Sequence, residues 1–578
     1  MEKWFVTTKK ADFEAISKEF GIDQVLARII RNRDIIKKKD IDLFLNGTLS
    51  DLHNPRLMKD LEKGCEIILE KIAENKKIRV IGDYDIDGVC ATHILKRGLN
   101  LAGADVDTVV PHRINDGYGL NHSLIEDAHE EGIDTIITCD NGISAYDQIS
   151  YAKELGMTVV VTDHHEVPYR EEKGKREEIL PPAAAVIDPK QEKCQYPFSG
   201  ICGAVVAYKF VDVLLELSGQ VTEEQRQEFL REELCFAAIA TIGDVMDLLD
   251  ENHIIVKFGL EAVKECKNAG LHALLAVNDL ENTKLSPYHV GFVIGPCINA
   301  TGRLDTATRA LELFDTDNER IAVKLAVELK ELNENRKVLT PKRLEEAIEK
   351  VEARPIPSVL VIYLPDCHES IAGIIAGKIK ERYNRPTIVL TKAEDGVKGS
   401  GRSIEAYSMY DKLHEVESLF TKYGGHPMAA GLSMASESDV HVLREKLNKK
   451  ANLKESDFIN KVYIDVAMPI SYLKISLIEE LERLAPYGNG NPKPLFAQKN
   501  VKLCQGVVLG KNRNVARFTC NDGMGNRVEA IYFGEADEML AQVEAHDGIC
   551  SIVYYPEINE YRGRKSIQIV VKYYDFNS

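Results

Sequence analysis

Short apolar runs alternate with longer amphipathic segments between residues 76 and 190. The runs are KIRVI, DVDTVV, DTIITC, MTVVV and AAAVI, and their length and β-branched residues are typical of strands. The segment VCATHILKRGLNLAGA, which follows the first run closely, has the apolar spacing of a helix. Strands that alternate with helices predict an α/β fold with a doubly wound parallel sheet, covered by helices on both faces.

The rest of the chain divides into segments with different patterns. Residues 1–55 look helical and polar, and residues 200–316 look mostly helical, with polar loops expected at TIGDVMDL and GPCINATGRLD. In the charged run 317–352 we expect Pro341 to kink a helix or to start a new one. PSVLVIYL then opens a second α/β unit. The predicted segments are 1–55, 56–316, 317–352, 353–455 and 456–578.

The C-terminal segment contains several short β-rich runs. VKLCQGVVL, VARFTC, RVEAIYF, ICSIVYY and KSIQIVVKYY follow the turn-rich stretch PYGNGNPKPLF. This series predicts a small β-barrel of the oligonucleotide-binding (OB) type. Phe518, Tyr532 and Tyr561 either fill the core of this barrel, as barrel aromatics more often do, or stack on nucleic-acid bases.

Acidic and imidazole side chains follow the predicted strands of the first unit. GDYDIDG follows the first strand, TCDNGIS includes the end of the third, and TDHHE includes the end of the fourth. GDYDIDG is not an EF-hand loop, because the twelfth residue from Asp83 is Ile94 rather than glutamate, and a strand precedes it. With TIGDVMDL added, these stretches supply the candidate chemistry: Asp83, Asp85, Asp87, Asp140, Asp163, His164, His165 and Asp244.

These side chains are expected to meet, because parallel strands place their carboxyl ends at one edge of a sheet. Carboxylates gathered there would repel one another and raise their pKa values. A divalent cation would remove that penalty. Oxygen ligands with one or two imidazoles suit Mn²⁺ or Mg²⁺, and a carboxylate that bridges two ions would make a two-metal hydrolytic site.

Composition narrows the class of protein. The chain has 578 residues, of which 44% are hydrophobic and 28% charged, as in globular proteins with several cores. We expect a cytoplasmic protein without a membrane span or signal segment, and its twelve cysteines form no C-x-x-C pair. The net charge of −18 argues only weakly against nucleic acid, because residues 498–578 carry as many basic as acidic residues.

The ordered set of motifs resembles the DHH phosphoesterase superfamily and, within it, the RecJ family of 5′→3′ exonucleases specific for single-stranded DNA. DYDIDG, CDNGIS, TDHH and GDV carry the first resemblance. PHRINDGYGLN, GPCINATGRLD, GSGRS, YGGHPMAAGL and PYGNGNPKPLF carry the second. The resemblance implies a DHH catalytic domain over 56–316, a connecting helix, a DHH-associated domain over 353–455 with GSGRS and GGH in glycine-rich turns, and an OB-like domain near the C-terminus.

The resemblance also implies a role for each site residue. One metal would be held by Asp85, Asp140, His164 and Asp244, and the second by Asp83 and the bridging Asp140. Ile81 stands where many members have a histidine, so the second metal would have fewer protein ligands. His165 would act on the scissile phosphate, with Asp140 and Asp85 as the other catalytic residues and Asp87 and Asp163 in support. Contacts to substrate phosphates would come from Arg113, Arg303, Arg402 and His426.

The leading hypothesis is therefore a Mn²⁺- or Mg²⁺-dependent exonuclease that hydrolyses single-stranded DNA to 5′-mononucleotides in recombination and repair. A monomer is expected, and the family implies a single-strand-binding protein and a helicase as partners. One alternative is a phosphodiesterase of the same superfamily that acts on short oligoribonucleotides or cyclic dinucleotides. Another is a non-catalytic replication scaffold, although such a scaffold would be expected to have lost carboxylates.

Overall fold

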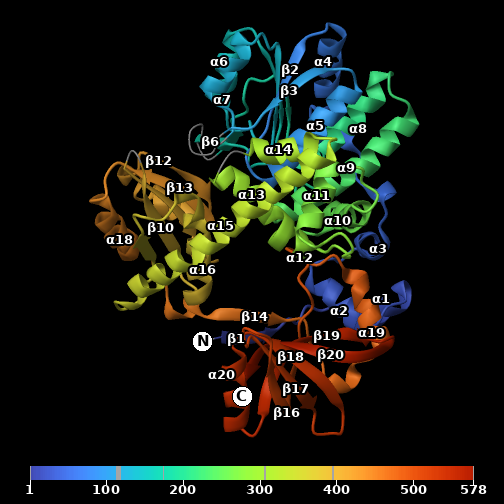
Figure 1. Ribbon diagram of the computed structural model, residues 1–578, viewed down its shortest axis with the longest axis vertical. Coiled ribbons are helices and arrows are strands. Elements are labelled where there is room, and N and C mark those ends of the chain that lie inside the picture. Colours follow the sequence, from blue (N-terminus) through green and yellow to red (C-terminus); the bar gives the residue numbers. More distant parts are fainter. Residues whose placement is uncertain (1, 112–118, 173–174, 305–306, 394–395, 577–578) are drawn as a thin grey trace.

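The first domain contains a five-stranded sheet whose strands are all parallel (Figure 1). The computed structural model describes residues 2–111, 119–172, 175–304, 307–393 and 396–576. The strand order is β3-β2-β4-β5-β8, which confirms the predicted doubly wound arrangement. The strands are β2 (Lys77–Ile81), β3 (Asp105–Val109), β4 (Thr135–Cys139), β5 (Thr158–Thr162) and β8 (Ala185–Ile187).

Helices cover both faces of this sheet because each face is apolar. The helices α6 (His122–Glu130) and α7 (Tyr146–Glu154) bury one face, which includes Ile81 and Val161. The helices α4 (Leu61–Ala73), α5 (Ile86–Leu101) and α8 (Gly203–Ser218) lie on the other face. Strand β2 has β3 on one side and β4 on the other, so the chain reverses its winding direction there. In such sheets the crevice beyond the carboxyl ends of the strands receives ligands.

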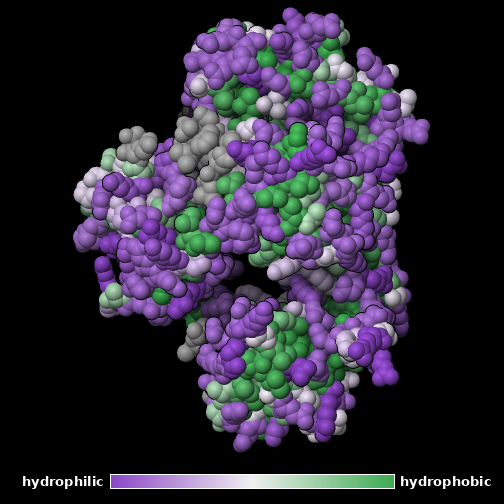
Figure 2. Space-filling view, in the orientation of Figure 1, coloured by the Kyte–Doolittle hydropathy of each residue, from purple (hydrophilic) through white to green (hydrophobic). Residues whose placement is uncertain are grey.

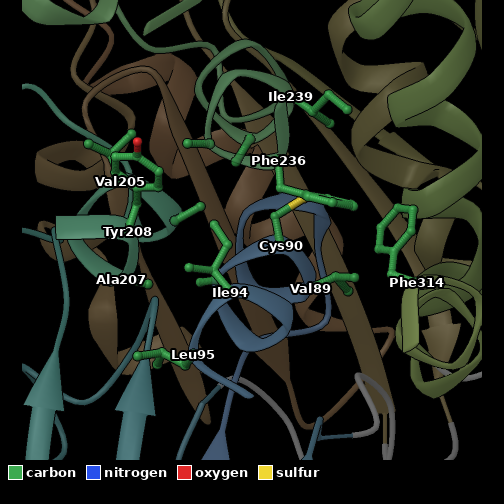
Figure 3. Packing of buried hydrophobic residues seen from close by; sticks show 14 of the residues in the cluster. Val89, Cys90, Ile94, Leu95, Val205, Ala207, Tyr208, Phe236, Ile239 and Phe314 are labelled. Carbon is green, nitrogen blue, oxygen red and sulfur yellow. The ribbon is translucent and has the colours of Figure 1, made fainter. Parts of the chain in front are cut away.

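A helical layer extends this domain beyond α8. Figure 3 shows Cys90 of α5 beside Phe236 of α9, and Phe236 meets Phe314 of α14 at 5.0 Å between ring centroids. GPCINATGRLD, expected to be a loop, is mostly helix α13, because its apolar Cys297 and Ile298 are fully buried. The helices are α9 (Glu223–Gly243), α10 (Asp250–Ala262), α11 (Ala269–Val277), α12 (Pro287–His289), α13 (Gly295–Leu304) and α14 (Thr308–Asp315).

Helix α15 (Glu319–Glu352) connects the first domain to the second. It is one helix through Pro341, so the expectation that this proline starts a new helix is wrong. Proline removes one backbone hydrogen bond, and the hydroxyl of Thr340 donates to the carbonyl of Arg336 at 2.7 Å in the same turn. Buried Leu325 and Ala326 pack the first part of the helix, and Ala347 packs its end against the second domain.

The second α/β domain has a mixed five-stranded sheet in the order β12-β13-β11-β10-β9. Only β9 and β10 are parallel. GSGRS and GGH were expected in turns, but GSGR and GGH lie in strands, where a Cβ on Gly399 would lie 2.4 Å from Leu390. The elements are β9 (Leu360–Tyr363), α16 (Glu369–Tyr383), β10 (Thr387–Ala393), β11 (Gly396–Arg402), α17 (Met409–His414), β12 (Lys422–His426), β13 (Ala429–Met434) and α18 (Asp439–Lys449).

The C-terminal domain is a closed five-stranded barrel, as predicted. Strand β16 pairs with both β17 and β19, which closes the sheet. Phe518 is buried in the barrel core, whereas 67% of Tyr561 is exposed. The elements are β15 (Val466–Ala467), α19 (Ile475–Leu481), β16 (Phe496–Leu509), β17 (Val515–Asn521), β18 (Arg527–Phe533), α20 (Ala536–Ala545), β19 (Ile549–Tyr561) and β20 (Arg564–Asp575).

The N-terminal residues join the C-terminal domain. Residues 2–6 were expected to be helical, but they form strand β1 (Glu2–Val6), which pairs in parallel with β14 (Asn460–Ile464). The helices are α1 (Phe13–Phe20), α2 (Gln24–Asn32) and α3 (Lys38–Asn46). Apolar side chains of α2 and α3, such as Leu26 and Phe44, share one core with the barrel. In the described part of the chain, no helix combines the length and apolarity that a membrane crossing requires.

Candidate metal centre

Carboxylates and imidazoles from four chain segments meet beyond the carboxyl ends of β2, β4 and β5. Asp83 and Asp85 follow β2, Asp140 follows β4, and Asp244 ends helix α9. Possible ligand atoms lie within 4.8 Å of one another in three overlapping groups. The groups are Asp83, Asp85 and Asp140; Asp140, His164 and His165; and Asp87, His164 and Asp244. The structure therefore brings together seven of the eight acidic and imidazole residues singled out in the sequence. The eighth, Asp163, lies beside His165.

His164 lies at the centre of the cluster. Its Nε2 is 3.1 Å from Oδ1 of Asp140 and 3.7 Å from Oδ2 of Asp244. Its Nδ1 is buried and has no hydrogen-bond partner among the described residues. Burial lowers the pKa of His164 to about 4, although nearby carboxylates oppose the shift. The imidazole is therefore neutral near pH 7, which is the form that binds a metal.

The carboxyl of Asp140 lies in surroundings that disfavour its charged form. Burial and the charges of Asp87 and Asp85 raise the pKa of its carboxyl well above the ordinary value. Burial and the same two charges raise the pKa of Asp244 to about 8. Carboxylates packed this tightly ionise together only when cations lie between them. The donor set of oxygens with imidazole nitrogen fits Mn²⁺ or Mg²⁺.

The start of helix α8 packs closely against Asp140. Asp140 has a φ of 59°, in the left-handed region that few side chains other than Asn and Asp adopt. Helix α8 begins against it at Gly203, where an added Cβ would lie 2.8 Å from the Asp140 Cβ. We infer that glycine is required at residue 203 for the helix to start this close to the cluster.

Asp85 and Asp87 each accept hydrogen bonds from backbone N–H groups at the start of a helix, Asp85 at α5 and Asp87 at α8. Oδ1 of Asp85 accepts hydrogen bonds from the backbone N–H groups of Asp87 and Gly88 and so caps α5. The carboxylate of Asp87, expected to support the cluster, accepts from the N–H groups of Gly203 and Ala204 at 2.7 Å, at the start of α8. Oδ2 of Asp87 is also 3.5 Å from Nε2 of His164, so Asp87 ties α8 to the cluster.

Asp163 holds His165 in place. Its Oδ1 accepts from Nδ1 of His165 at 2.7 Å, and its Oδ2 accepts from the N–H of Ile143. Burial would lower the pKa of His165, but the charge of Asp163 and this hydrogen bond outweigh burial and raise it to about 9. The pKa of Asp163 falls to about 2 despite its burial, because of the charge and hydrogen bond of His165. The pair is therefore ionic near pH 7.

We expect Asp163→Asn to lower the pKa of His165, because the opposing charge is lost while burial stays. Turnover should fall about 10- to 100-fold, as for other partners that orient a functional histidine. NMR titration of the His165 imidazole measures the first effect and a steady-state assay the second. A variant whose His165 still titrates near pH 9 would show that Asp163 does not set its charge.

The side chains of His426 and Arg402, two of the four predicted phosphate contacts, lie in the second domain. His426 ends β12, and the charge of His165 is one cause, after burial, of its lowered pKa, so the second domain faces the cluster there. Arg402 is half-buried beside Gly373 and donates to the carbonyl of Gly401. Arg113 lies outside the described residues, as does the side chain of Arg303. Ile81 ends β2, and its side chain is fully buried in the core under α6 and α7.

The end of the fifth strand contributes two residues that the sequence analysis missed. Asp188 directly follows β8, and burial and the charge of Asp163 raise its pKa to about 8. Nζ of Lys190 is 3.2 Å from Glu166, and its charge acts on both Asp244 and His426. The rule that located the other site residues, polar side chains at strand ends, applies equally to the stretch AVIDPK.

The turn-rich stretch before the barrel docks beside the cluster. Asn489 donates to the carbonyl of Val245 at 3.0 Å and to Oδ1 of Asp247 at 2.7 Å. Its own carbonyl accepts from the N–H of Leu248. Val245 directly follows Asp244. These bonds therefore connect the loop after Asp244 to the stretch that precedes the barrel.

The fold and the cluster together define a DHH-type phosphoesterase. A family profile described as "DHH family, N-terminal domain" matches residues 77–241, and one described as "DHHA1 domain" matches residues 357–453. A third, described as "RecJ OB domain", matches residues 464–573. The third match shows that the C-terminal barrel is the OB domain found in RecJ proteins.

Comparison with individual proteins gives the family. The chain is 32% identical to the single-stranded-DNA-specific exonuclease RecJ of Bacillus subtilis, over 99% of this chain and 70% of that protein. It is 31% identical to RecJ of Haemophilus influenzae, over 95% of this chain and 96% of that protein. The crystal structure of Thermus thermophilus RecJ in complex with Mn²⁺ matches with a TM-score of 0.83 and 27% identity, over 99% of this chain and 79% of that one. The chain belongs to the RecJ family of exonucleases.

Proposed function

We propose that this protein is a metal-dependent 5′→3′ exonuclease that hydrolyses single-stranded DNA to 5′-mononucleotides, in DNA recombination and repair. The observation that carries the proposal is the cluster of aspartates and histidines, which forms three overlapping groups of three residues whose ligand atoms lie within 4.8 Å of one another. The relatives are named for activity on single-stranded DNA, and solved RecJ structures hold Mn²⁺ or Mg²⁺.

Two divalent cations, Mn²⁺ or Mg²⁺, fit the donor set of the cluster. Asp85, Asp140, His164 and Asp244 would hold one, and Asp83 with the bridging Asp140 the other. The ions would screen the negative phosphodiester and favour ionisation of the attacking water. Asp87 would support the cluster from α8, because its oxygens already accept two backbone N–H groups there.

His165 would bind the substrate phosphate. Its Nδ1 donates to Asp163, and its Nε2–H would donate to a phosphate oxygen. A pKa of about 9 keeps the ring cationic at neutral pH, and a charge-assisted hydrogen bond would strengthen as negative charge develops on the phosphoryl oxygens.

The substrate strand would pass between the two α/β domains. His165 belongs to the first and His426 to the second, and the charge of His165 acts on His426. Lys190 and Arg402 are further candidates for phosphate contact, since Arg and Lys are the usual phosphate partners. We infer that a phosphate at His165 is held from both domains at once, which favours a single strand over a duplex.

The test is digestion of strands that differ only in end and strandedness. A 5′-phosphorylated single strand with Mn²⁺ should release 5′-mononucleotides from its 5′ end, and a blunt duplex should not be attacked. Release from the 3′ end, or equal attack on the duplex, would overturn the proposal. Faster hydrolysis of a dinucleotide than of a long strand would instead identify a phosphodiesterase of short oligonucleotides.

Three further expectations accompany this function. The twelve cysteines are free thiols, which suits a reducing cytoplasm. The single-strand-binding protein and the helicase implied by the resemblance stay predictions, as does the monomeric state.

A further inference from the structure

The strands β1 and β14 form a two-stranded parallel ribbon with two different faces. Side chains alternate between the faces of a strand. Val462 and Ile464 of β14 are buried against Val553 of the barrel, and Trp4 of β1 packs with them. The neighbouring residues in each strand therefore point away from the barrel.

The outward face of the ribbon combines lysines with aromatic rings. Lys3 pairs in register with Lys461, and Phe5 pairs with Tyr463. The exposed fractions are 43% for Phe5 and 57% for Tyr463, and their ring centroids are 6.0 Å apart at an interplanar angle of 33°. We call these four residues the ribbon face.

The charges of the ribbon face are not neutralised locally. Neither Lys3 nor Lys461 takes part in an ion pair with another described residue, although the chain as a whole has a net charge of −18. Glu2, the one acid in β1, lies on the barrel side, where burial and then the charge of Glu2 raise the pKa of Tyr573. Positive charge and aromatic surface thus coincide on a solvent-exposed face.

The position of the ribbon connects it to the substrate path. Strand β14 belongs to the connection from α18 of the second domain to the barrel. In Figure 1 the ribbon lies along the border of the barrel that faces the two α/β domains, and Figure 2 shows an opening between the upper and lower parts of the molecule there. A strand that extends from the metal centre toward the barrel would meet this face.

We propose that the ribbon face binds single-stranded DNA on the 3′ side of the nucleotide being hydrolysed. Lys3 and Lys461 contact phosphates, and Phe5 and Tyr463 stack on bases. Proteins that hold single strands without sequence preference combine these same two elements, a basic track and aromatic stacking platforms. The inference rests on the proposed function, because it assumes that a single strand is the substrate.

Two double variants test the two elements separately. Phe5→Leu with Tyr463→Leu keeps an apolar surface but removes stacking, and should weaken binding of a long single strand about 10-fold. Phe5→Tyr with Tyr463→Phe keeps two rings and should bind like the wild type. Affinity is measured by fluorescence anisotropy in EDTA, so that the strand is not degraded.

The lysine variant gives a second, independent measurement. Lys3→Gln with Lys461→Gln should reduce the slope of log affinity against log salt by about 1.4, which is about 0.7 for each phosphate contact to a single strand. The control is Lys77→Gln with Lys153→Gln, which removes two exposed lysines at the amino-terminal edge of the first sheet, opposite the metal centre. The control should leave both affinity and slope unchanged.

A short substrate separates this inference from the proposed function. Turnover of a 5′-phosphorylated oligonucleotide below about 4 nucleotides, which is shorter than the site of one barrel, should be the same in the ribbon variants and the wild type. Unchanged long-strand affinity in both variants would overturn the ribbon proposal, as would a change in molar mass by light scattering without a change in affinity, which indicates a dimer face. A wild type that degrades neither substrate would instead refute the proposed function.

Discussion

Asp140→Asn is expected to reduce turnover on single-stranded DNA by about 10³-fold or more, while the metal-free variant is at least as stable as the wild type. The loss follows from the bridging position proposed for Asp140, because one neutral residue would then replace a ligand of both ions. Stability does not fall, because burial and four neighbouring aspartates already oppose the charge of Asp140. Asparagine also tolerates the left-handed backbone at this residue.

The measurement combines an activity assay with thermal unfolding in EDTA. A matched control is Asp105→Asn, an exposed carboxylate at the amino-terminal end of β3, on the opposite edge of the same sheet. The control should keep wild-type turnover. If Asp140→Asn also kept it, the assignment of Asp140 as a metal ligand would be wrong.

Removing divalent metal should abolish activity and make stability depend steeply on pH. The folded-state pKa of Asp244 is raised to about 8, and that of Asp140 is also raised, mainly by burial and then by the other carboxylates. A carboxyl with a raised pKa binds its proton more tightly in the folded state than in the unfolded state. The metal-free protein should therefore lose stability as the pH rises from about 4 to about 8.

Thermal unfolding at several pH values, with EDTA and with Mn²⁺, checks this expectation. Added Mn²⁺ should stabilise the protein most at the alkaline end, because the ionised carboxylates are the metal-binding form. Equal unfolding temperatures with and without metal across this range would contradict the metal centre. The Asp140→Asn variant should show a weaker pH dependence in EDTA, since it lacks one of the titrating groups.

The sequence predicted the sheet and the acidic edge because both depend on local patterns. A buried parallel strand is a short β-branched run, and polar residues that follow several such runs must meet when the strands are parallel. The same logic reaches Asp188 and Lys190 after the fifth strand. They were missed only because AVIDPK contains no familiar motif.

Three structural features could not be predicted from the local sequence, because they depend on tertiary packing. Glycines in GSGRS indicate turns when taken alone, but in the structure they let neighbouring side chains such as Leu390 pack against a strand. GPCINATGRLD has a polar composition, yet tertiary burial of Cys297 and Ile298 makes it a helix. The partner of β1 lies more than four hundred residues away at β14, and no local pattern indicates such a pairing.

The shared core of α2, α3 and the barrel has a consequence for biosynthesis. The helices α2 and α3 emerge from the ribosome before the barrel, but Leu26 and Phe44 belong to the same core as residues as distant as Ile569. Those helices must wait, with apolar surface exposed, until the last strand has been translated. The two α/β domains need no such delay, so we expect nascent chains to fold these domains before the core that α2, α3 and the barrel share.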